Sequence, residues 1–145
     1  MKSERKKKVA EYKSTVNIGY THEAGVAYER DIVSRSIQFS IRVIKLYREL
    51  EKDNVGRIIG KQLLKSGTSI GANIHEAQGG QTKPDFITKI TIAFKEARET
   101  IYWLKVIEES GIIPASRLVE IRDEANQITK TLSSIILTAK QNLKK

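Results

Sequence analysis

The residues best suited to chemistry in this 145-residue chain lie between positions 73 and 99. Asn73, His75 and Glu76 form a polar cluster, and His75-Glu76 matches the first half of the His-Glu-x-x-His zinc motif. In that motif two histidines one helical turn apart bind the metal, and the glutamate acts as general base. Position 79 is glycine, and the other histidine, His22, lies far away in the sequence. We therefore expect no metal site.

A carboxylate-lined core is the other catalytic possibility, with Glu76, Glu96 and Glu99 as candidate ligands. Di-iron bundles combine two Glu-x-x-His motifs with two further glutamates. No glutamate of this chain is followed three positions later by histidine. We therefore expect a protein without catalytic residues or cofactors, and an enzyme with a carboxylate-lined core is a distant alternative.

A hydrogen-bonded polar layer is the interpretation that we favour for these side chains. Asn73 and Glu76 would face Arg98 and Glu99 from the following helix, with Tyr102 as a further possible partner. Buried polar groups need hydrogen-bond partners. Such a layer would fix the register of two helices.

Tyr102 and Trp103 form the one adjacent pair of aromatic residues. Neighbouring residues of a helix point about 100° apart, since one turn takes 3.6 residues. Both rings therefore cannot lie in one core seam, and we expect the pair to contribute to an oligomer interface. Exposed Trp and Tyr are typical of subunit contacts.

The composition indicates a basic protein without thiol chemistry. The formal net charge is +9 and the sequence pI is about 9.8, which favours polyanionic partners such as RNA or DNA. Cysteine is absent, so disulfides and thiolate metal sites are excluded. No apolar run approaches the ~20 residues of a membrane span, and no apolar segment follows the basic N-terminus as in a secretory signal. We expect a cytoplasmic protein.

Four segments have the apolar periodicity of amphipathic helices. The first runs from about residue 29 to 50, the second from 55 to 78, the third from 82 to 110, and the fourth follows Pro114. On the first helix the predicted apolar face comprises Ile32, Val33, Ser36, Ile37, Ser40, Val43, Ile44 and Tyr47. On the second it comprises Ile58, Ile59, Leu63, Ile70, Ile74 and Ala77. On the fourth, Leu118, Ile121, Ala125, Ile128, Leu132, Ile135 and Ala139 form a heptad seam.

Glycines mark both the interior and the ends of these helices. Gly67 and Gly71 lie one turn apart inside the second helix, where each costs roughly 0.8–1.0 kcal/mol relative to alanine. We expect another helix to approach closely there. Gly79-Gly80 should end the helix, with one glycine in the left-handed conformation. Thr82 is predicted to cap the third helix and Gly111 to end it.

The predicted fold is all-α: an antiparallel up-down four-helix bundle over residues 29–145 with a basic arm over residues 1–28. Short connections between the helices favour this topology. In the arm, Gly19 and Gly25 interrupt any helical pattern, and Lys6, Lys7 and Lys8 are clustered. The arm is either a phosphate-contacting tail or a solvated extension.

Residues 62–103 also resemble a known family. The resemblance rests on S-G-T-S-I-G-A-N at 66–73, E-A-Q at 76–78, D-F at 85–86 and K-E-A-R-E-T-x-Y-W at 95–103, and it extends over residues 28–140. These motifs resemble the bacterial four-helix-bundle family, also called 23S rRNA intervening-sequence proteins. The resemblance implies a cytosolic bundle that assembles into rings, with pentamers favoured. A related branch associates with the reverse transcriptase and RNA of diversity-generating retroelements. The family has no established catalytic residues to transfer.

These observations lead to two main functional hypotheses. The first is a homo-oligomer that binds structured RNA or DNA through basic faces. The second is an accessory subunit that binds a protein, such as a retroelement reverse transcriptase. The residues predicted to contact nucleic acid are Lys6, Lys7, Lys8, Arg35, Arg42, Lys45, Lys61 and Lys65.

Overall fold

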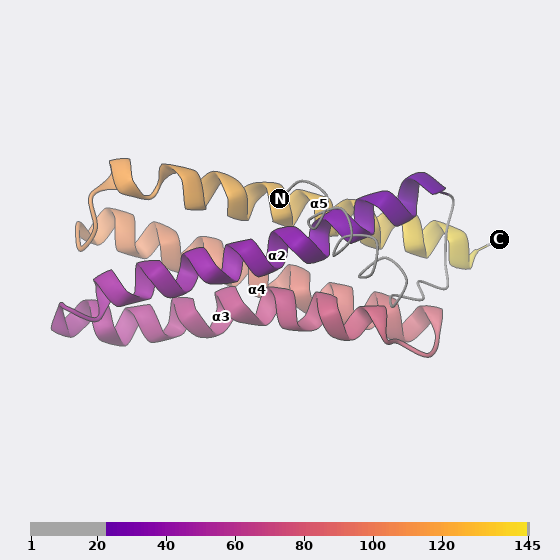
Figure 1. The fold of residues 1–145 in the computed structure, drawn as a ribbon, viewed down its shortest axis with the longest axis horizontal. Helices are drawn as coiled ribbons and strands as arrows, with labels where there is room; N and C mark the ends of the chain where they lie inside the picture. The colour runs from indigo at the N-terminus through magenta and orange to yellow at the C-terminus, as the bar shows by residue number, and fades with distance from the viewer. Residues whose placement is uncertain (1–22, 145) are drawn as a thin grey trace, which may run out of the picture.

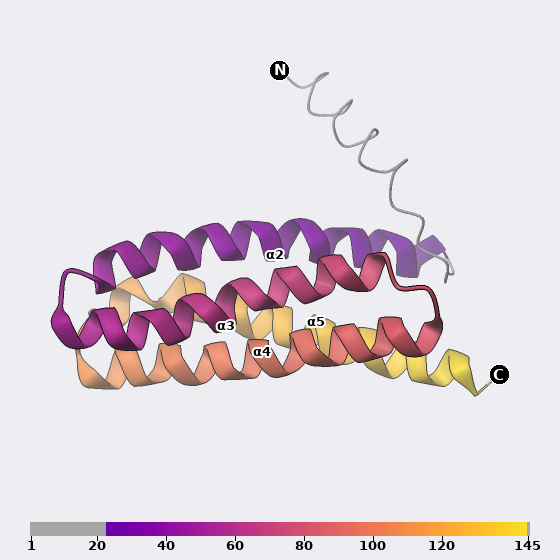
Figure 2. The same ribbon diagram turned by 90° about the horizontal axis from the view of Figure 1, so that it is seen from below.

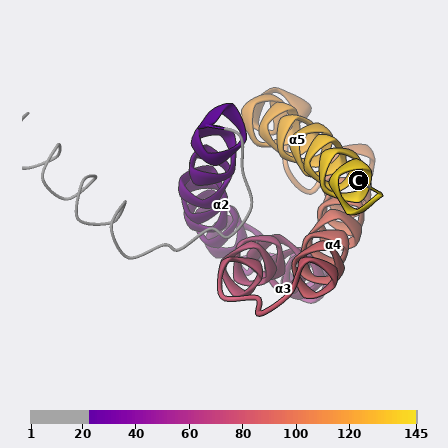
Figure 3. The same ribbon diagram turned by 90° about the vertical axis from the view of Figure 1, so that its right-hand side faces the viewer.

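The chain folds as an antiparallel bundle of long helices. The computed structural model describes residues 23–144. In this range α2 spans Glu23–Leu50, α3 Asn54–Gln78, α4 Lys83–Ser110 and α5 Val119–Leu143, and the short 3-10 helix η1 (Ala115–Arg117) precedes α5. The helices run up and down along one long axis (Figures 1 and 2). Seen end-on, α2, α3, α4 and α5 follow one another around a common core (Figure 3). The predicted all-α four-helix bundle is confirmed.

Local capping signals set most of the helix boundaries. The Asp53 carboxylate accepts a hydrogen bond from the Gly56 N–H at 2.7 Å, which begins α3. Thr82 Oγ1 accepts from the Asp85 N–H at 3.2 Å, which begins α4. Each oxygen satisfies one of the N–H groups that a helix start leaves unpaired. Gly111 ends α4 with φ of 74°, a left-handed conformation that glycine adopts without strain.

Some predictions about the helix ends differ from the structure. α2 begins at Glu23, so Gly25 lies inside the helix instead of interrupting it. One glycine costs a helix only about 1 kcal/mol, which the rest of this long helix offsets. α3 does end at Gln78, but Gly79 has φ of −91° and neither Gly79 nor Gly80 is left-handed. Lys6, Lys7 and Lys8 lie outside the described residues.

The core face of α2 is narrower than predicted. Ile37 and Ile44 are 47% and 40% exposed, whereas Phe39 is fully buried. The buried residues of α2 are mostly spaced by four and three positions, as in a heptad, so they form a single stripe along the helix. Ile58 of α3 is likewise 65% exposed. The predicted seam of α5 is buried, apart from the half-buried Ala139. The buried stripe of α2 comprises Ile32, Val33, Ser36, Phe39, Val43 and Leu50.

The glycines of α3 allow α2 to approach closely, as predicted. A Cβ atom added at Gly67 would lie 2.8 Å from Val43 Cγ2, and one added at Gly71 would lie 3.1 Å from Ser36 Oγ. Distances below 3.0 Å require the neighbouring atoms to move. These contacts place the middle of α3 directly against the middle of α2.

Candidate nucleic-acid interface

His75 and Glu76 both have exposed side chains on α3. Glu76 Oε2 lies 2.7 Å from Lys89 Nζ of α4, so its charge is already paired, and His75 is exposed. Among the side chains of residues 31–144, no group of three or more His, Cys, Asp or Glu is arranged to hold a metal ion. The pair is therefore part of the outer surface of the bundle.

The predicted polar layer does not form. Asn73 Nδ2 donates to the carbonyl oxygen of Ser69 at 2.8 Å, within its own helix. Arg98 and Glu99 are exposed, and Glu99 Oε1 accepts from Trp103 Nε1 at 3.3 Å along α4. The prediction was wrong because the buried positions of α3 include Ser66, Ile70 and Ala77, whereas Asn73 is only half-buried and Glu76 is exposed. Glu76 joins the two helices only through its exposed ion pair.

A smaller buried contact takes the place of that layer. Thr100 Oγ1 lies 3.0 Å from Ser66 Oγ, and both residues are buried. The two hydroxyls also contact carbonyl oxygens of their own helices, those of Glu96 and Leu63. Sequence periodicity carried a signal for this pair, because Ser66 and Thr100 both occupy positions with core spacing.

Residues 67–71 read Gly-Thr-Ser-Ile-Gly, the pattern of a nucleophile elbow. That motif needs a sharp turn between a strand and a helix, which exposes the serine. Here the whole pattern lies inside α3, and Ser69 Oγ donates to the carbonyl oxygen of Lys65 at 2.6 Å. The motif therefore provides small residues for packing and no activated nucleophile.

Two of the predicted nucleic-acid contacts connect helices instead. Arg42 Nη1 lies 2.7 Å from Glu124 Oε2 of α5, and the Glu124 side chain is only 15% exposed. Arg35 Nη2 donates to Gln127 Oε1, also of α5, at 2.8 Å. Both guanidinium groups thus stabilise the contact between α2 and α5. They are less available to phosphates than Lys45, Lys61 and Lys65, which are exposed.

The remaining cations lie on the outer surface of α2 and α3. We call Lys45, Arg48, Arg57, Lys61 and Lys65 the basic face, and all five are exposed. The close contact of Gly60 with Tyr47, 3.0 Å for an added Cβ atom, sets the two segments side by side. The sequence predicted Lys45, Lys61 and Lys65 but omitted Arg48 and Arg57. These two were missed because the helix pairing that brings them together was not known.

Two long stretches of α2 and α3 lack acidic residues, and Glu49, Glu51 and Asp53 lie at the connection between them. Residues 32–48 and 54–75 contain no Asp or Glu. By contrast, α4 carries five Lys or Arg and five Asp or Glu, and α5 carries three of each. The excess positive charge of the helices is therefore concentrated on α2 and α3.

At the edge of the basic face, Lys65 acts on an acidic neighbour of α4. Partial burial raises the pKa of the Glu96 carboxyl above its ordinary value, and the nearby charge of Glu99 raises it further. The charge of Lys65 works in the opposite direction and lowers this pKa. Lys65 therefore borders the acidic pair Glu96 and Glu99 of α4.

Tyr102 and Trp103 point in different directions, as predicted. Tyr102 is 58% exposed, while Trp103 is half-buried and packs against the core. Their ring centroids lie 4.9 Å apart at an interplanar angle of 71°. Tyr102 is thus the member of the pair that can contact another molecule.

Two comparisons with known proteins agree with this architecture. The family model described as 23S rRNA-intervening sequence protein matches residues 29–134. A solved structure of a protein of unknown function from the S23 ribosomal protein family of Bacteroides thetaiotaomicron VPI-5482 superposes with a TM-score of 0.70. It is 40% identical and covers 75% of this chain and 97% of its own. No curated protein matches the chain significantly. No helix in the described range is long and apolar enough to cross a membrane.

Proposed function

Because the chain belongs to the 23S rRNA-intervening sequence protein family, we propose that it is a non-enzymatic homo-oligomer that binds structured RNA through the basic face. The observation that carries this proposal is the absence of acidic residues from 32–48 and 54–75. Five exposed cations lie on these two stretches, and the neighbouring carboxylates of Glu49, Glu51 and Asp53 are confined to the connection between them, so the surface is predominantly positive. Such surfaces attract phosphate backbones.

The proposed binding is mainly electrostatic. Each lysine or arginine that neutralises a phosphate releases condensed counterions, so affinity falls as salt concentration rises. Assembly of several subunits would repeat the basic face and multiply this attraction. The proposal includes a ring, with a pentamer favoured, in the cytoplasm and without a cofactor. Lys6, Lys7 and Lys8 are proposed as additional phosphate contacts.

A salt series tests the proposal. The probes are a fluorescent RNA hairpin and a DNA duplex of equal length, titrated with the full chain. Replacing both Lys61 and Lys65 with glutamine should reduce the slope of log affinity against log salt by about 2, since each lost phosphate contact contributes about 1. The matched control replaces Lys95 and Lys105, which are exposed on α4.

The outcomes are distinct. A reduction of the salt slope that occurs only in the Lys61 and Lys65 variant supports the basic face as the binding surface. Equal losses for both pairs of substitutions would mean that only the net charge matters, which contradicts the proposal. No binding to either probe at low salt would also reject it. Tighter binding to the hairpin than to the duplex would support RNA as the ligand.

A protein-binding accessory role is the second candidate function. Three isoleucines exposed on α2, Ile37, Ile41 and Ile44, favour it because aliphatic side chains add nothing to phosphate binding. The proposed partner class is a nucleic-acid enzyme such as a reverse transcriptase. Recovery of that enzyme with the tagged protein after nuclease treatment would support this role over direct RNA binding.

A further inference from the structure

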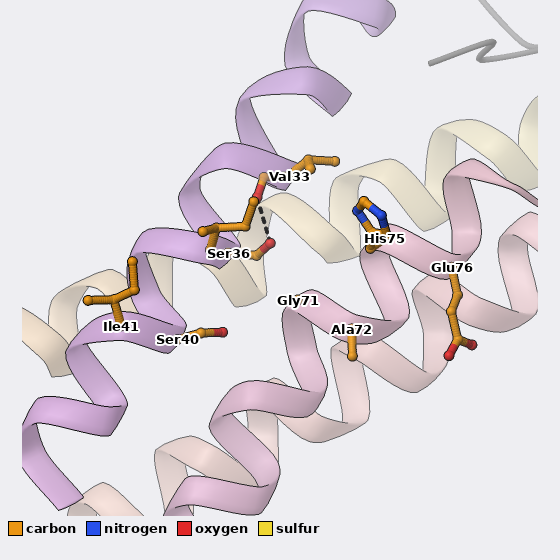
Figure 4. Close-up of a pocket in the computed structure, with 9 residues that line it drawn as sticks. Val33, Ser36, Ser40, Ile41, Gly71, Ala72, His75 and Glu76 are labelled. Atoms are coloured by element: carbon orange, nitrogen blue, oxygen red, sulfur yellow. Dashed lines mark hydrogen bonds between the residues drawn. The ribbon is translucent and has the colours of Figure 1, made fainter. Parts of the chain in front are cut away.

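A groove lies between α2 and α3 at the end of the pair away from the basic face. Its volume is about 470 Å³. Small residues line its middle, where Ser36 and Ser40 of α2 face Gly71 and Ala72 of α3 (Figure 4). Ile37 and Ile41 of α2 also line it. Gly71 and Ala72 add little side-chain volume to this wall of the groove.

An apolar stripe extends the groove along α2. Ile37, Ile41 and Ile44 are 47%, 41% and 40% exposed and are spaced by four and then three residues. This spacing places them on one side of the helix. Three large aliphatic side chains in a row are unusual on a free surface and are typical of a docking site. They match the i, i+4, i+7 spacing with which helices dock into grooves.

Positive charge lies beyond one end of the groove. At one end Ile44 is followed by Lys45 and, about one turn further, by Arg48 of the basic face. At the other end lies Glu76, whose carboxylate is bound to Lys89 and points away from the groove (Figure 4). A complementary ligand is therefore apolar over the groove and acidic where it reaches the lysines.

We propose that this groove binds an amphipathic α-helix of a protein partner, with apolar side chains against the isoleucine stripe and carboxylates beside Lys45 and Arg48. The distance along α2 from Val33 to Arg48 corresponds to about 22 Å at 1.5 Å per residue, or a ligand helix of about 15 residues. RNA fits the isoleucine stripe poorly, because its aliphatic side chains provide neither hydrogen-bond donors nor aromatic rings for stacking. The inference does not depend on RNA binding by the basic face.

A designed peptide provides the test. The probe is a fluorescent 16-residue helix with leucines at i, i+4, i+7 and i+11 and with glutamates concentrated in one half. Its control is a scrambled peptide of identical composition. With the full chain in fluorescence anisotropy, the amphipathic peptide should bind at least tenfold more tightly. Ala72→Trp, which fills the groove, should weaken binding at least tenfold, and Thr88→Trp at an exposed position of α4 should not.

Three results would overturn the proposal. Equal binding of the two peptides would mean that their shared composition and charge, and not the amphipathic pattern, determine the affinity. A lower molecular mass for Ala72→Trp in light scattering would assign the groove to a second copy of the chain. Tighter binding of a synthetic peptide of residues 1–22 than of the probe would assign it to the N-terminal segment. Ala72→Trp leaves all five cations of the basic face in place, so RNA binding should persist whatever the peptide result.

Discussion

Ser66 Oγ and Thr100 Oγ1 lie 3.0 Å apart inside the bundle and connect α3 to α4. Outside the core, Glu76 and Lys89 connect the same two helices with a contact of 2.7 Å. From Ser66 to Glu76 the chain advances along α3, while from Thr100 to Lys89 it moves back along α4 by nearly the same number of residues. The buried hydroxyls and the exposed ion pair therefore specify one antiparallel register.

Thr100→Val should lower the free energy of unfolding by about 1 kcal/mol, the net value of a typical hydrogen bond. The substitution keeps the shape of the side chain but leaves Ser66 with only the Leu63 carbonyl as partner. Urea unfolding of Thr100→Val, Ser66→Ala and the double variant would measure the coupling. The double variant should lose less than the sum of the single losses, and strict additivity would contradict the coupling.

Gly67→Ala should destabilise the bundle by about 1–3 kcal/mol through overpacking. The added Cβ atom would lie 2.8 Å from Val43 Cγ2, and the better helix propensity of alanine offsets only about 1 kcal/mol. Thermal unfolding followed by circular dichroism would measure the loss. Val43→Ala should restore part of the stability by making space.

Gly79→Ala is the matched control for that substitution. A Cβ atom at this position would lie 3.7 Å from the nearest atom, and φ is −91°, which any residue adopts. Its stability should stay close to that of the original chain. Equal destabilisation by both alanines would contradict close packing as the cause.

Glu96→Gln should stabilise the protein near neutral pH and have a smaller effect in acid. The pKa of Glu96 is raised in the folded state, chiefly by burial. The folded protein therefore favours the protonated carboxyl, and this advantage is present below the ordinary pKa and is lost as pH rises through the folded value. Unfolding midpoints of both proteins from about pH 3.5 to 7 would measure the trend, around the usual glutamate range. A difference between the two unfolding midpoints that grows as the pH falls would contradict this expectation.

Arg42→Gln should lower stability while affecting RNA binding less than Lys65→Gln does. Arg42 connects α2 to Glu124 of α5, and removing it leaves a mostly buried carboxylate without its cation. Half of the arginine side chain is exposed, so we expect a cost near the upper end of exposed ion pairs, about 1 kcal/mol. A double-mutant cycle with Glu124→Gln, together with hairpin titrations, separates the two roles. A larger loss of RNA affinity for Arg42→Gln than for Lys65→Gln would show that Arg42 belongs to the RNA-binding surface.

The fold was predictable because local signals and periodicity agreed. Thr82, Asp53 and Gly111 mark helix ends through interactions with their own neighbours, so each boundary can be recognised without tertiary information. The bundle then follows from short connections. Ile37 and Ile44 show the limit of periodicity, because an apolar residue beside the core stripe has the same pattern whether a neighbouring helix covers it or not.

The candidate site was less predictable because it depends on pairing between helices. Arg35 and Arg48 look equivalent in the sequence, yet Arg35 bonds to Gln127 of α5 while Arg48 joins the basic face. The prediction of a polar layer was wrong for the same reason. Asn73 satisfies its amide within its own helix, so a polar side chain near a core stripe did not need a partner across the interface.

Tyr102→Glu should reduce the mass of the assembled protein without unfolding the subunit. Tyr102 is 58% exposed and contributes little to the core, so a charged side chain there can remain solvated in the isolated subunit. In an interface the same carboxylate would be buried without a partner, at a cost of several kcal/mol. Light scattering at micromolar concentration and thermal unfolding would measure the two effects, with Thr88→Glu as the control at another exposed position of α4. An unchanged mass for Tyr102→Glu would exclude this ring from the oligomer interface, whereas a smaller mass with an unchanged melting temperature would place Tyr102 in the contact between subunits.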